Sequence, residues 1–294
     1  MSYRKDKELS LINTHNSIDS AELAELFKDN WQAGIHGIAF SAYEEGQEPG
    51  VQITEAQIRK RMKILQPHVQ WIRSFSCTDG NEMIPVIAKE YGIKTLVGAW
   101  LSDDTELNQR EMSKLIELAQ AGFVDIAAVG NEVLYRQEMT EDELLHAISS
   151  VKGQIKDIPV AYVDAYYEFE NRPRITEICD VILANCYPFW EGCHSNYAIL
   201  YMQDMYRRAV KAGKGKKVII SECGWPNKGQ SHHGAHPSNE NAMKYFINTQ
   251  NWSREDDVEV FYFSSFDEAW KIGDEGDVGA YWGVYDKDEN LKYQ

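Results

Sequence analysis

Short apolar segments recur along the chain, rich in β-branched residues and interrupted by charge where each apolar stretch stops. Segments of this kind are typical of strands buried on both faces of a parallel sheet. We predict strands at Gly37–Tyr43, Val69–Cys77, Lys94–Leu101, Val124–Val129, Pro159–Val163, Asp180–Cys186, Lys217–Ser221 and Val258–Ser265.

Amphipathic segments with helix start signals lie between these strands. Thr54 and Thr140 each stand three residues before a Gln or Glu, which is the spacing of a capping box. Asp104 begins a helical pattern that ends at Gly122, and Ser238 begins another. Because strands and helices alternate, the pattern predicts an α/β fold with a parallel sheet. Eight such units in 294 residues favour a (β/α)8 TIM barrel that forms one catalytic domain over residues 1–294.

An open, doubly wound sheet is the alternative architecture for this pattern. Such a sheet usually has a phosphate-binding loop after its first strand, but Ser41–Gly46 contains neither a GxGxxG nor a GxxxxGK[ST] motif. No long helix is evident after the last strand. We expect a helix at about Asp19–Asn30, before the first strand, to cover the barrel wall near that gap.

The charge of the chain narrows the classes of partner. Thirty basic and 46 acidic side chains give a net charge of -16, which disfavours nucleic acid and anionic membrane surfaces. No apolar stretch reaches the roughly 20 residues of a membrane span, and Met1–Asp6 lacks the apolar core of a signal peptide. We expect a cytoplasmic monomer, or a periplasmic or secreted protein if a leader has been trimmed.

The cysteines and histidines give little support for a metal site. Five cysteines are present without a CxxC pair, and most lie in or beside predicted strands, so we expect free thiols in a reducing compartment. The segment His232–His236 could ligate a metal, but it lies in a loop without an acidic partner at helical spacing, so a cleft-lining loop is the better interpretation. No metal or cofactor is expected.

Two glutamates, Glu132 and Glu222, stand where predicted strands four and seven end. In a (β/α)8 barrel, the carboxyl ends of the strands form the active site. Cleavage of a glycosidic bond with retention needs two carboxyl groups roughly 5 to 5.5 Å apart, one as nucleophile and one as acid/base. Each glutamate alone could be a structural ion-pair partner, but together they predict a retaining glycosidase.

Five sequence blocks around these positions resemble glycoside hydrolase family 17, β-1,3-glucanases and glucanosyltransferases, in its shorter bacterial form. The resemblance runs through nearly the whole chain from about Gly34. The blocks are Val129–Leu134 (VGNEVL), Asn185–Trp190 (NCYPFW), Ser221–Pro226 (SECGWP), Phe266–Lys271 (FDEAWK) and Tyr281–Gly283 (YWG).

The resemblance implies a role for each residue of the catalytic set. Glu132 would be the general acid/base and Glu222 the nucleophile, with Asn131 placed to hydrogen-bond the sugar 2-hydroxyl. In these roles, Glu222 must be ionised and Glu132 must hold its proton near neutral pH. Cys223 replaces the threonine that is usual beside the nucleophile, which could make the site sensitive to oxidation, and Cys186 replaces a more common aliphatic residue.

Further polar residues are candidates to support the site. Tyr187 could donate its hydroxyl group to the nucleophile. Glu268 and Lys271 match a charged pair of the family pattern that would orient the site, although an interior ion pair is the alternative. Arg73 could steady Glu222 or could point to the surface.

Aromatic residues are abundant at or just beyond the predicted strand ends. Sugar rings have apolar C–H faces that stack on such side chains, so this set predicts a groove for several glucose units, with core packing as the alternative for any one residue. The residues are Tyr43, Trp100, Tyr135, Tyr166, Tyr167, Tyr187, Trp190, Trp225, Trp270 and Trp282.

Three functions compete for this sequence. The first is a retaining hydrolase of β-1,3-glucan or its oligosaccharides. The second is a β-1,3-glucanosyltransferase, which needs the same catalytic residues and differs in whether water or an acceptor sugar reaches the intermediate. The third is a non-catalytic carbohydrate-binding barrel, which the presence of both glutamates disfavours. Another β-linked glucose polymer is an alternative substrate.

Overall fold

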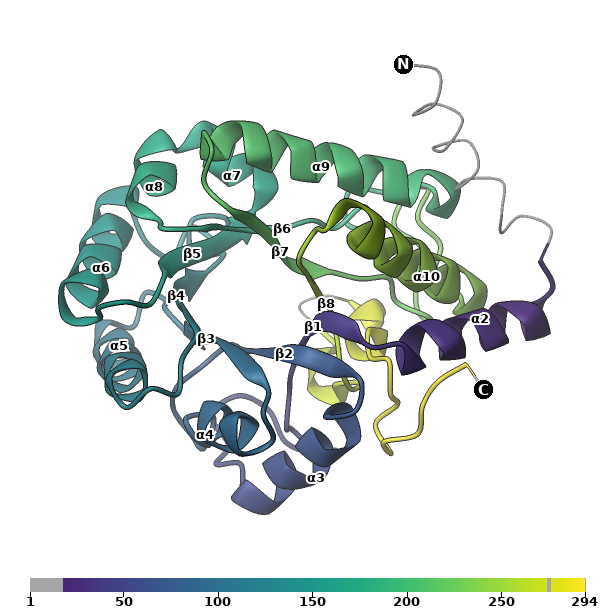
Figure 1. The fold of residues 1–294 in the computed structure, drawn as a ribbon, viewed down its shortest axis with the longest axis horizontal. Helices are drawn as coiled ribbons and strands as arrows, with labels where there is room; N and C mark the ends of the chain where they lie inside the picture. The colour runs from purple at the N-terminus through teal and green to yellow at the C-terminus, as the bar shows by residue number, and fades with distance from the viewer. Residues whose placement is uncertain (1–17, 274–275, 294) are drawn as a thin grey trace.

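The computed structural model of the protein describes residues 18–273 and 276–293, and eight parallel strands form a closed ring at its centre (Figure 1). Each strand pairs with the next one in the sequence, and β1 pairs with β8 to close the barrel. The strands are β1 Ile35–Ala39, β2 Val69–Ser74, β3 Lys94–Ala99, β4 Ile126–Asn131, β5 Val160–Ala165, β6 Ile182–Asn185, β7 Val218–Cys223 and β8 Val260–Tyr262. The predicted (β/α)8 TIM barrel is confirmed. The expectation for Met1–Asp6 lies outside the described residues.

The strand ends differ from the prediction in ways that matter for the site. Strands β4, β5 and β7 continue two residues beyond their predicted ends, so that Glu222 lies within β7. A polar side chain does not end a strand whose backbone still pairs, and the Cys186 N–H donates to the Glu222 carbonyl at 2.9 Å. Strand β8 is shorter than predicted and ends at Tyr262, although the Ser265 N–H still donates to Ala39 of β1 at 3.0 Å.

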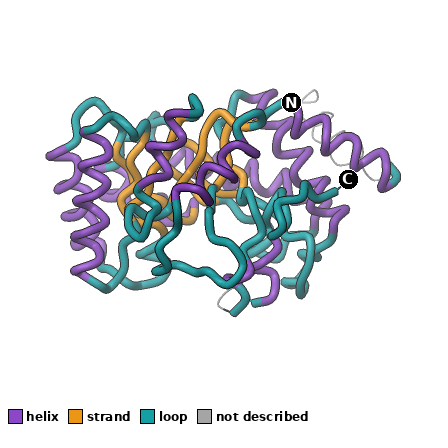
Figure 2. Tube along the Cα trace, turned by 90° about the horizontal axis from the view of Figure 1, so that it is seen from below, coloured by secondary structure: helices purple, strands orange, loops and turns teal. Residues whose placement is uncertain are grey.

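Helices surround the ring of strands, and the loops gather mainly at one end of the barrel (Figure 2). Side chains of Thr54, Asp104, Thr140 and Ser238 cap the helices that they were predicted to begin. In the described ranges, no helix has both the length and the apolar character needed to cross a membrane. The helices are α2 Ser20–Gln32, α3 Glu55–Leu65, α4 Met83–Glu90, α5 Thr105–Gln120, α6 Glu141–Gln154, α7 Tyr166–Asn171, α8 Pro173–Ile178, α9 Ala198–Gly213 and α10 Asn239–Asp256.

Helix α2 lies beside α10 on the outside of the barrel (Figure 1). The rings of Phe27 and Phe246 pack with centroids 4.8 Å apart, and the indole N–H of Trp31 donates to the Tyr285 hydroxyl at 3.1 Å. Since the described residues after β8 form only short 3-10 helices, α2 supplies helical cover on this side of the barrel, as the sequence predicted.

Candidate active site

Both predicted catalytic glutamates lie at the carboxyl-terminal mouth of the barrel. Glu132 directly follows β4, and Glu222 is the fifth residue of the six in β7. Asn185 of β6 connects them: it is the register partner of Glu222, and its side-chain amide donates to Oε1 of Glu132 at 2.8 Å. One short side chain therefore links the carboxyl group of Glu132 to the strand pair that carries Glu222.

The backbone of Glu132 is in the left-handed region, with φ at +54°. A non-glycine residue in this region costs roughly 1–3 kcal/mol and persists only where its surroundings enforce it. Here the Glu132 N–H donates to the Val163 carbonyl and the Glu132 carbonyl accepts from the Arg136 N–H, both at 2.8 Å. This left-handed conformation turns the chain out of β4 at Glu132, whose side chain lies at the mouth.

The surroundings of Glu132 favour its protonated form. Burial is the main cause that raises its pKa to about 7, and the negative charges of Glu222 and Asp164 act in the same direction. The hydrogen bond from Asn185 and the positive charge of Arg136 oppose them without outweighing them. A carboxyl group with this pKa can hold a proton near neutral pH and can also release it.

Glu222 has the opposite surroundings. Arg73 of β2 donates to Oε1 at 2.5 Å, and the Tyr187 hydroxyl group donates to Oε2 at 2.6 Å. The second guanidinium nitrogen of Arg73 donates to Oδ1 of Asn131 at 2.7 Å, and the guanidinium plane lies 4.1 Å from the centroid of the Phe75 ring. These bonds to both carboxylate oxygens fix the orientation of the Glu222 side chain.

The predicted pair of Glu268 and Lys271 forms an ion pair at 3.0 Å beside this set. The indole N–H of Trp270 also donates to Glu268, at 3.2 Å. The Lys271 ammonium group lies 4.2 Å from the centroid of the Phe263 ring, which in turn packs edge-on against Tyr187. The pair is thus connected to Glu222 through Phe263 and Tyr187.

Six of the predicted sugar-binding aromatic residues are half-buried: Tyr43, Trp100, Tyr167, Tyr187, Trp190 and Trp270. The rings of Tyr43 and Trp270 meet edge-on at 6.1 Å on the β1 and β8 side of the barrel. Trp190, after β6, packs at 5.6 Å against the buried ring of Trp282, which is 5.5 Å from Tyr187. These rings stand on both sides of Tyr187 and Glu222.

Three other aromatic predictions do not hold, because the rings of Trp225, Tyr166 and Trp282 are buried. Trp225 is 1% exposed and packs between Phe189 and Tyr245, so its ring fills the core behind β7. Tyr166, on α7, is also buried, and its hydroxyl accepts from Arg208 at 3.0 Å on the outside of the barrel. Residues just past a strand end can turn outward into the helix layer as readily as inward to the mouth.

Sequence reasoning gave no role to Asn185, although it lies in one of the quoted blocks. The Ser221 hydroxyl donates to Oδ1 of Asn185 at 2.7 Å, which leaves the amide nitrogen to donate to Glu132. The available signal was its place at the end of strand six. Asp164, at the end of strand five, was likewise given no role from the sequence.

The loop His232–His236 packs beside the aromatic residue Trp190. The ring of His232 lies 6.0 Å from Trp190, and the backbone of Gly234 donates to Gly192 at 3.1 Å. Among the residues that the structure describes, no three His, Cys, Asp or Glu side chains are grouped as a metal site would require. The loop therefore lines the region of Trp190.

All five cysteines are free thiols. Cys223 and Cys186 are fully buried, and burial raises the pKa of both thiols. A buried thiol with a raised pKa is poorly reactive. The expected sensitivity of Cys223 to oxidation is therefore wrong for the folded protein.

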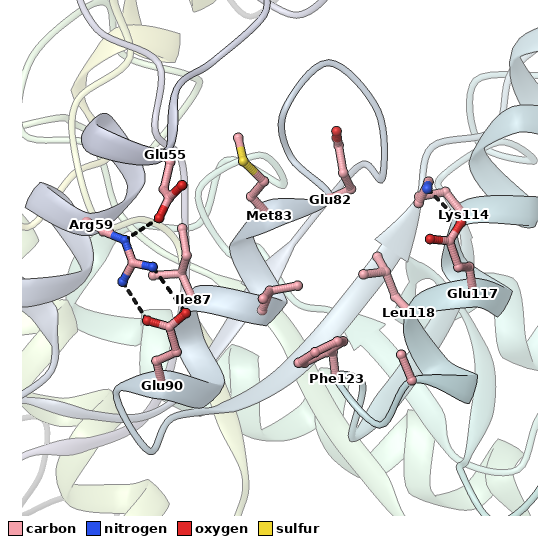
Figure 3. Close-up of a pocket in the computed structure, with 12 residues that line it drawn as sticks. Glu55, Arg59, Glu82, Met83, Ile87, Glu90, Lys114, Glu117, Leu118 and Phe123 are labelled. Carbon is pink, nitrogen blue, oxygen red and sulfur yellow. Dashed lines mark hydrogen bonds and ion pairs between the residues drawn. The ribbon is translucent and has the colours of Figure 1, made fainter.

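A cavity of about 310 Å³ lies away from the mouth, between α3, α4 and α5 (Figure 3). Its floor includes Ile87, Leu118 and Phe123, and exposed ion pairs such as Arg59 with Glu90 form its rim.

A closed (β/α)8 barrel with one protonatable and one guanidinium-paired glutamate at its mouth defines a glycosidase. The sequence profile of the BtgE/BtgC glycoside hydrolase domain matches residues 37–283, and the chain belongs to this family. The family resemblance that the sequence blocks carried is thereby confirmed.

Curated relatives and solved structures agree with this family. A glucan 1,3-beta-glucosidase of Schizosaccharomyces pombe is 28% identical over 250 residues, which cover 79% of this chain and 78% of the relative. The family 17 β-1,3-glucanosyltransferase of Rhizomucor miehei is 28% identical with a TM-score of 0.78, covering 89% of this chain and 96% of that one. An endo-laminarinase of Formosa, at 20% identity and a TM-score of 0.76, shares the fold.

Proposed function

We propose that this glycosidase acts on β-1,3-linked glucan or its oligosaccharides by double displacement with retention. The observation that carries the proposal is the contrast between the two glutamates: Glu222 bound by Arg73 and Tyr187, and Glu132 with a pKa of about 7. Relatives named as glucan 1,3-beta-glucosidases support the choice of glycan.

In the first half-reaction, the Glu222 carboxylate attacks the anomeric carbon while Glu132 gives its proton to the departing oxygen. The Arg73 bond to Asn131 directs the Asn131 amide nitrogen away from the guanidinium group, where it can donate to the sugar 2-hydroxyl. The bond from sugar to leaving group breaks and a covalent glycosyl-enzyme forms.

In the second half-reaction, the charge of Glu222 is absent because it is esterified. One of the causes that raise the pKa of Glu132 is then lost, so Glu132, which has just given its proton to the leaving group, stays ionised and can take a proton from water. The water oxygen attacks the anomeric carbon from the face that the leaving group vacated. The Glu222 ester bond breaks, and both carboxyl groups return to their starting states.

Half-buried aromatic rings would hold the glucan chain. Tyr43, Trp190 and Trp270 keep part of their ring surface accessible and lie on both sides of the glutamates, where C–H faces of successive sugars could stack. Trp282 contributes behind Trp190 by fixing that ring.

Transfer to an acceptor sugar is a second candidate outcome. It is favoured by the similarity to the Rhizomucor miehei β-1,3-glucanosyltransferase, one structure of which holds laminaritriose. We also propose that the protein acts as a monomer in a reducing compartment, because one chain supplies every residue of the set and its cysteines are unpaired.

The test is time-resolved product analysis with a β-1,3-linked glucose oligosaccharide, with the anomeric configuration of the first product followed by NMR. Shorter β-configured products are expected, and products longer than the substrate would establish transfer. First-formed α-products would contradict the double displacement. An intact oligosaccharide would show that the glycan is wrong.

A further inference from the structure

A tyrosine and an aspartate on β5 contact the turn that carries Glu132. Tyr162 and Asp164 are two residues apart, so their side chains share one face of the strand, and both are 0% exposed. The Tyr162 hydroxyl group donates to Oδ2 of Asp164 and accepts from the backbone N–H of Leu134 at 3.0 Å. Asp164 also accepts from the backbone N–H of Tyr135.

These bonds satisfy the first amide groups of the turn after Glu132. Once the chain leaves β4 through the left-handed Glu132, the amide groups of Leu134 and Tyr135 have no strand partner, and leaving them buried and unbonded would be costly. The ring of Tyr162 also lies against Gly130, where a Cβ atom would meet Cε2 at 3.4 Å. The pair therefore contacts the chain on both sides of Glu132.

We propose that Tyr162 and Asp164 are positioning residues for Glu132, which hold the strained turn so that its carboxyl group stays at the mouth beside Asn185. The inference rests on the proposed role of Glu132 as acid/base. It assigns a part in the reaction to two fully buried side chains outside the predicted catalytic set.

The charge of Asp164 adds a second contribution. From β5 it raises the pKa of Glu132, as Glu222 does from β7. Opposing them are Arg136 in the same turn and the hydrogen bond from Asn185 on β6. Removal of the Asp164 charge should therefore lower the pKa of Glu132.

The charge of Asp164 is itself governed by its neighbours. Burial raises its pKa to about 6, and Glu168 of α7 acts in the same direction. The hydrogen bond from Tyr162 and those from backbone amides oppose this. Asp164 is thus ionised on the alkaline side of about pH 6, which is the range in which Glu132 releases its proton.

The experiment compares Tyr162→Phe and Asp164→Asn with the unmodified protein on two substrates. One is a laminari-oligosaccharide, whose sugar leaving group needs protonation, and the other is a nitrophenyl glycoside of the same glycan, whose leaving group does not. We expect kcat/KM to fall roughly 10-fold on the oligosaccharide for Tyr162→Phe, a fraction of the full contribution of a general acid. On the nitrophenyl glycoside, kcat/KM should change little.

For Asp164→Asn, the pH profile is the decisive readout. The alkaline limb of kcat/KM should move to lower pH by about half a unit, because a like charge near Glu132 is lost. Tyr285→Phe is the matched control: it removes a buried tyrosine hydroxyl that bonds Trp31, far from the mouth. Tyr285→Phe should lower the unfolding temperature. It should change neither the alkaline limb of kcat/KM nor the ratio of kcat/KM on the two substrates.

The outcomes separate the two proposals. If both β5 variants lose only stability, as Tyr285→Phe is expected to do, the positioning role is overturned. If Glu132→Gln keeps full activity on the oligosaccharide, the proposed function itself fails. Tyr162→Phe keeps the ring against Gly130, so it decides the positioning role alone if Asp164→Asn does not fold.

Discussion

The ends of β4 and β7 place the same residue type in opposite surroundings. Glu222 lies within β7, where the register with β6 shifts, and both of its carboxylate oxygens are bound, by Arg73 and by Tyr187. Glu132 stands outside the ladder of β4 with φ at +54°, and its side chain accepts from the neutral amide of Asn185.

The difference shows how a fold divides one chemistry between two identical side chains. Glu222 is paired with the guanidinium group of Arg73, whereas burial and the charge of Glu222 both raise the pKa of Glu132. Since a nucleophile must be ionised and an acid must hold a proton, these surroundings support the roles proposed for the two residues. Each prediction below removes one part of this contrast.

The largest effect is expected for Glu222→Ala. Without the carboxylate, no glycosyl-enzyme can form, and kcat should fall by on the order of 10⁴-fold or more, as for removal of other covalent nucleophiles. Hydrolysis of a laminari-oligosaccharide measures the loss. Azide, which can replace the missing group on an activated substrate, should restore turnover with inverted configuration, and normal activity without azide would sink the assignment.

Glu132→Ala should give a smaller loss that depends on the leaving group. We expect kcat/KM to fall about 10² to 10⁴-fold on the oligosaccharide, because the departing oxygen is no longer protonated. On a nitrophenyl glycoside, kcat/KM should be largely kept while kcat falls, since the second step lacks its base. An equal loss on both substrates would contradict the acid/base role.

Arg73→Met tests the other side of the contrast. It leaves Glu222 buried without its charge partner, which is expected to cost about 3–5 kcal/mol of stability. Chemical denaturation measures this cost, and kcat should fall with it because Asn131 is also released. The double variant Arg73→Met with Glu222→Gln should recover much of the lost stability. No recovery would mean that Arg73 stabilises the fold by other contacts.

The fold was accessible from the sequence because its signals are local. Eight apolar runs and the caps at Thr54, Asp104, Thr140 and Ser238 depend on neighbouring residues, and they predicted the barrel. The strand ends were less accessible. At the mouth, pairing with the next strand decides where a strand ends, so the polar Glu222 stays inside β7.

The site was accessible only in part. The blocks around Glu132 and Glu222 identified both glutamates, and the structure places Arg73 and Tyr187 on Glu222. Trp225 was misassigned because the direction of its ring depends on space between β7 and α10 that sequence does not reveal. Asn185 and Asp164 lie at strand ends, which was the only signal in the sequence, and their contacts with distant segments cannot be read from a single sequence.

The raised pKa of Glu132 predicts how both activity and stability depend on pH. Activity needs its protonated form, so kcat/KM should fall as pH rises through about 7. For stability, the folded state binds the proton more tightly than the unfolded state, so the penalty begins above the unfolded pKa and is complete above about 7. Glu132→Gln should therefore stabilise the protein by about 1–3 kcal/mol at pH 8 and by little at pH 4. Denaturation at both pH values measures it, and equal effects would contradict the shift.

The smallest effect on catalysis is expected at the aromatic rim. Trp190 is half-buried and Trp225 is in the core, although the sequence gave both the same role. Trp190→Ala should raise KM by roughly 3- to 10-fold, the loss of one ring stacking contact, with kcat kept. Trp225→Ala should instead destabilise the protein by about 3–5 kcal/mol through the cavity that it leaves. Kinetics and thermal unfolding of both variants measure these effects. Because the two tryptophans differ in burial and not in residue type, a raised KM for Trp225→Ala with unchanged stability would mean that its ring reaches the sugar after all.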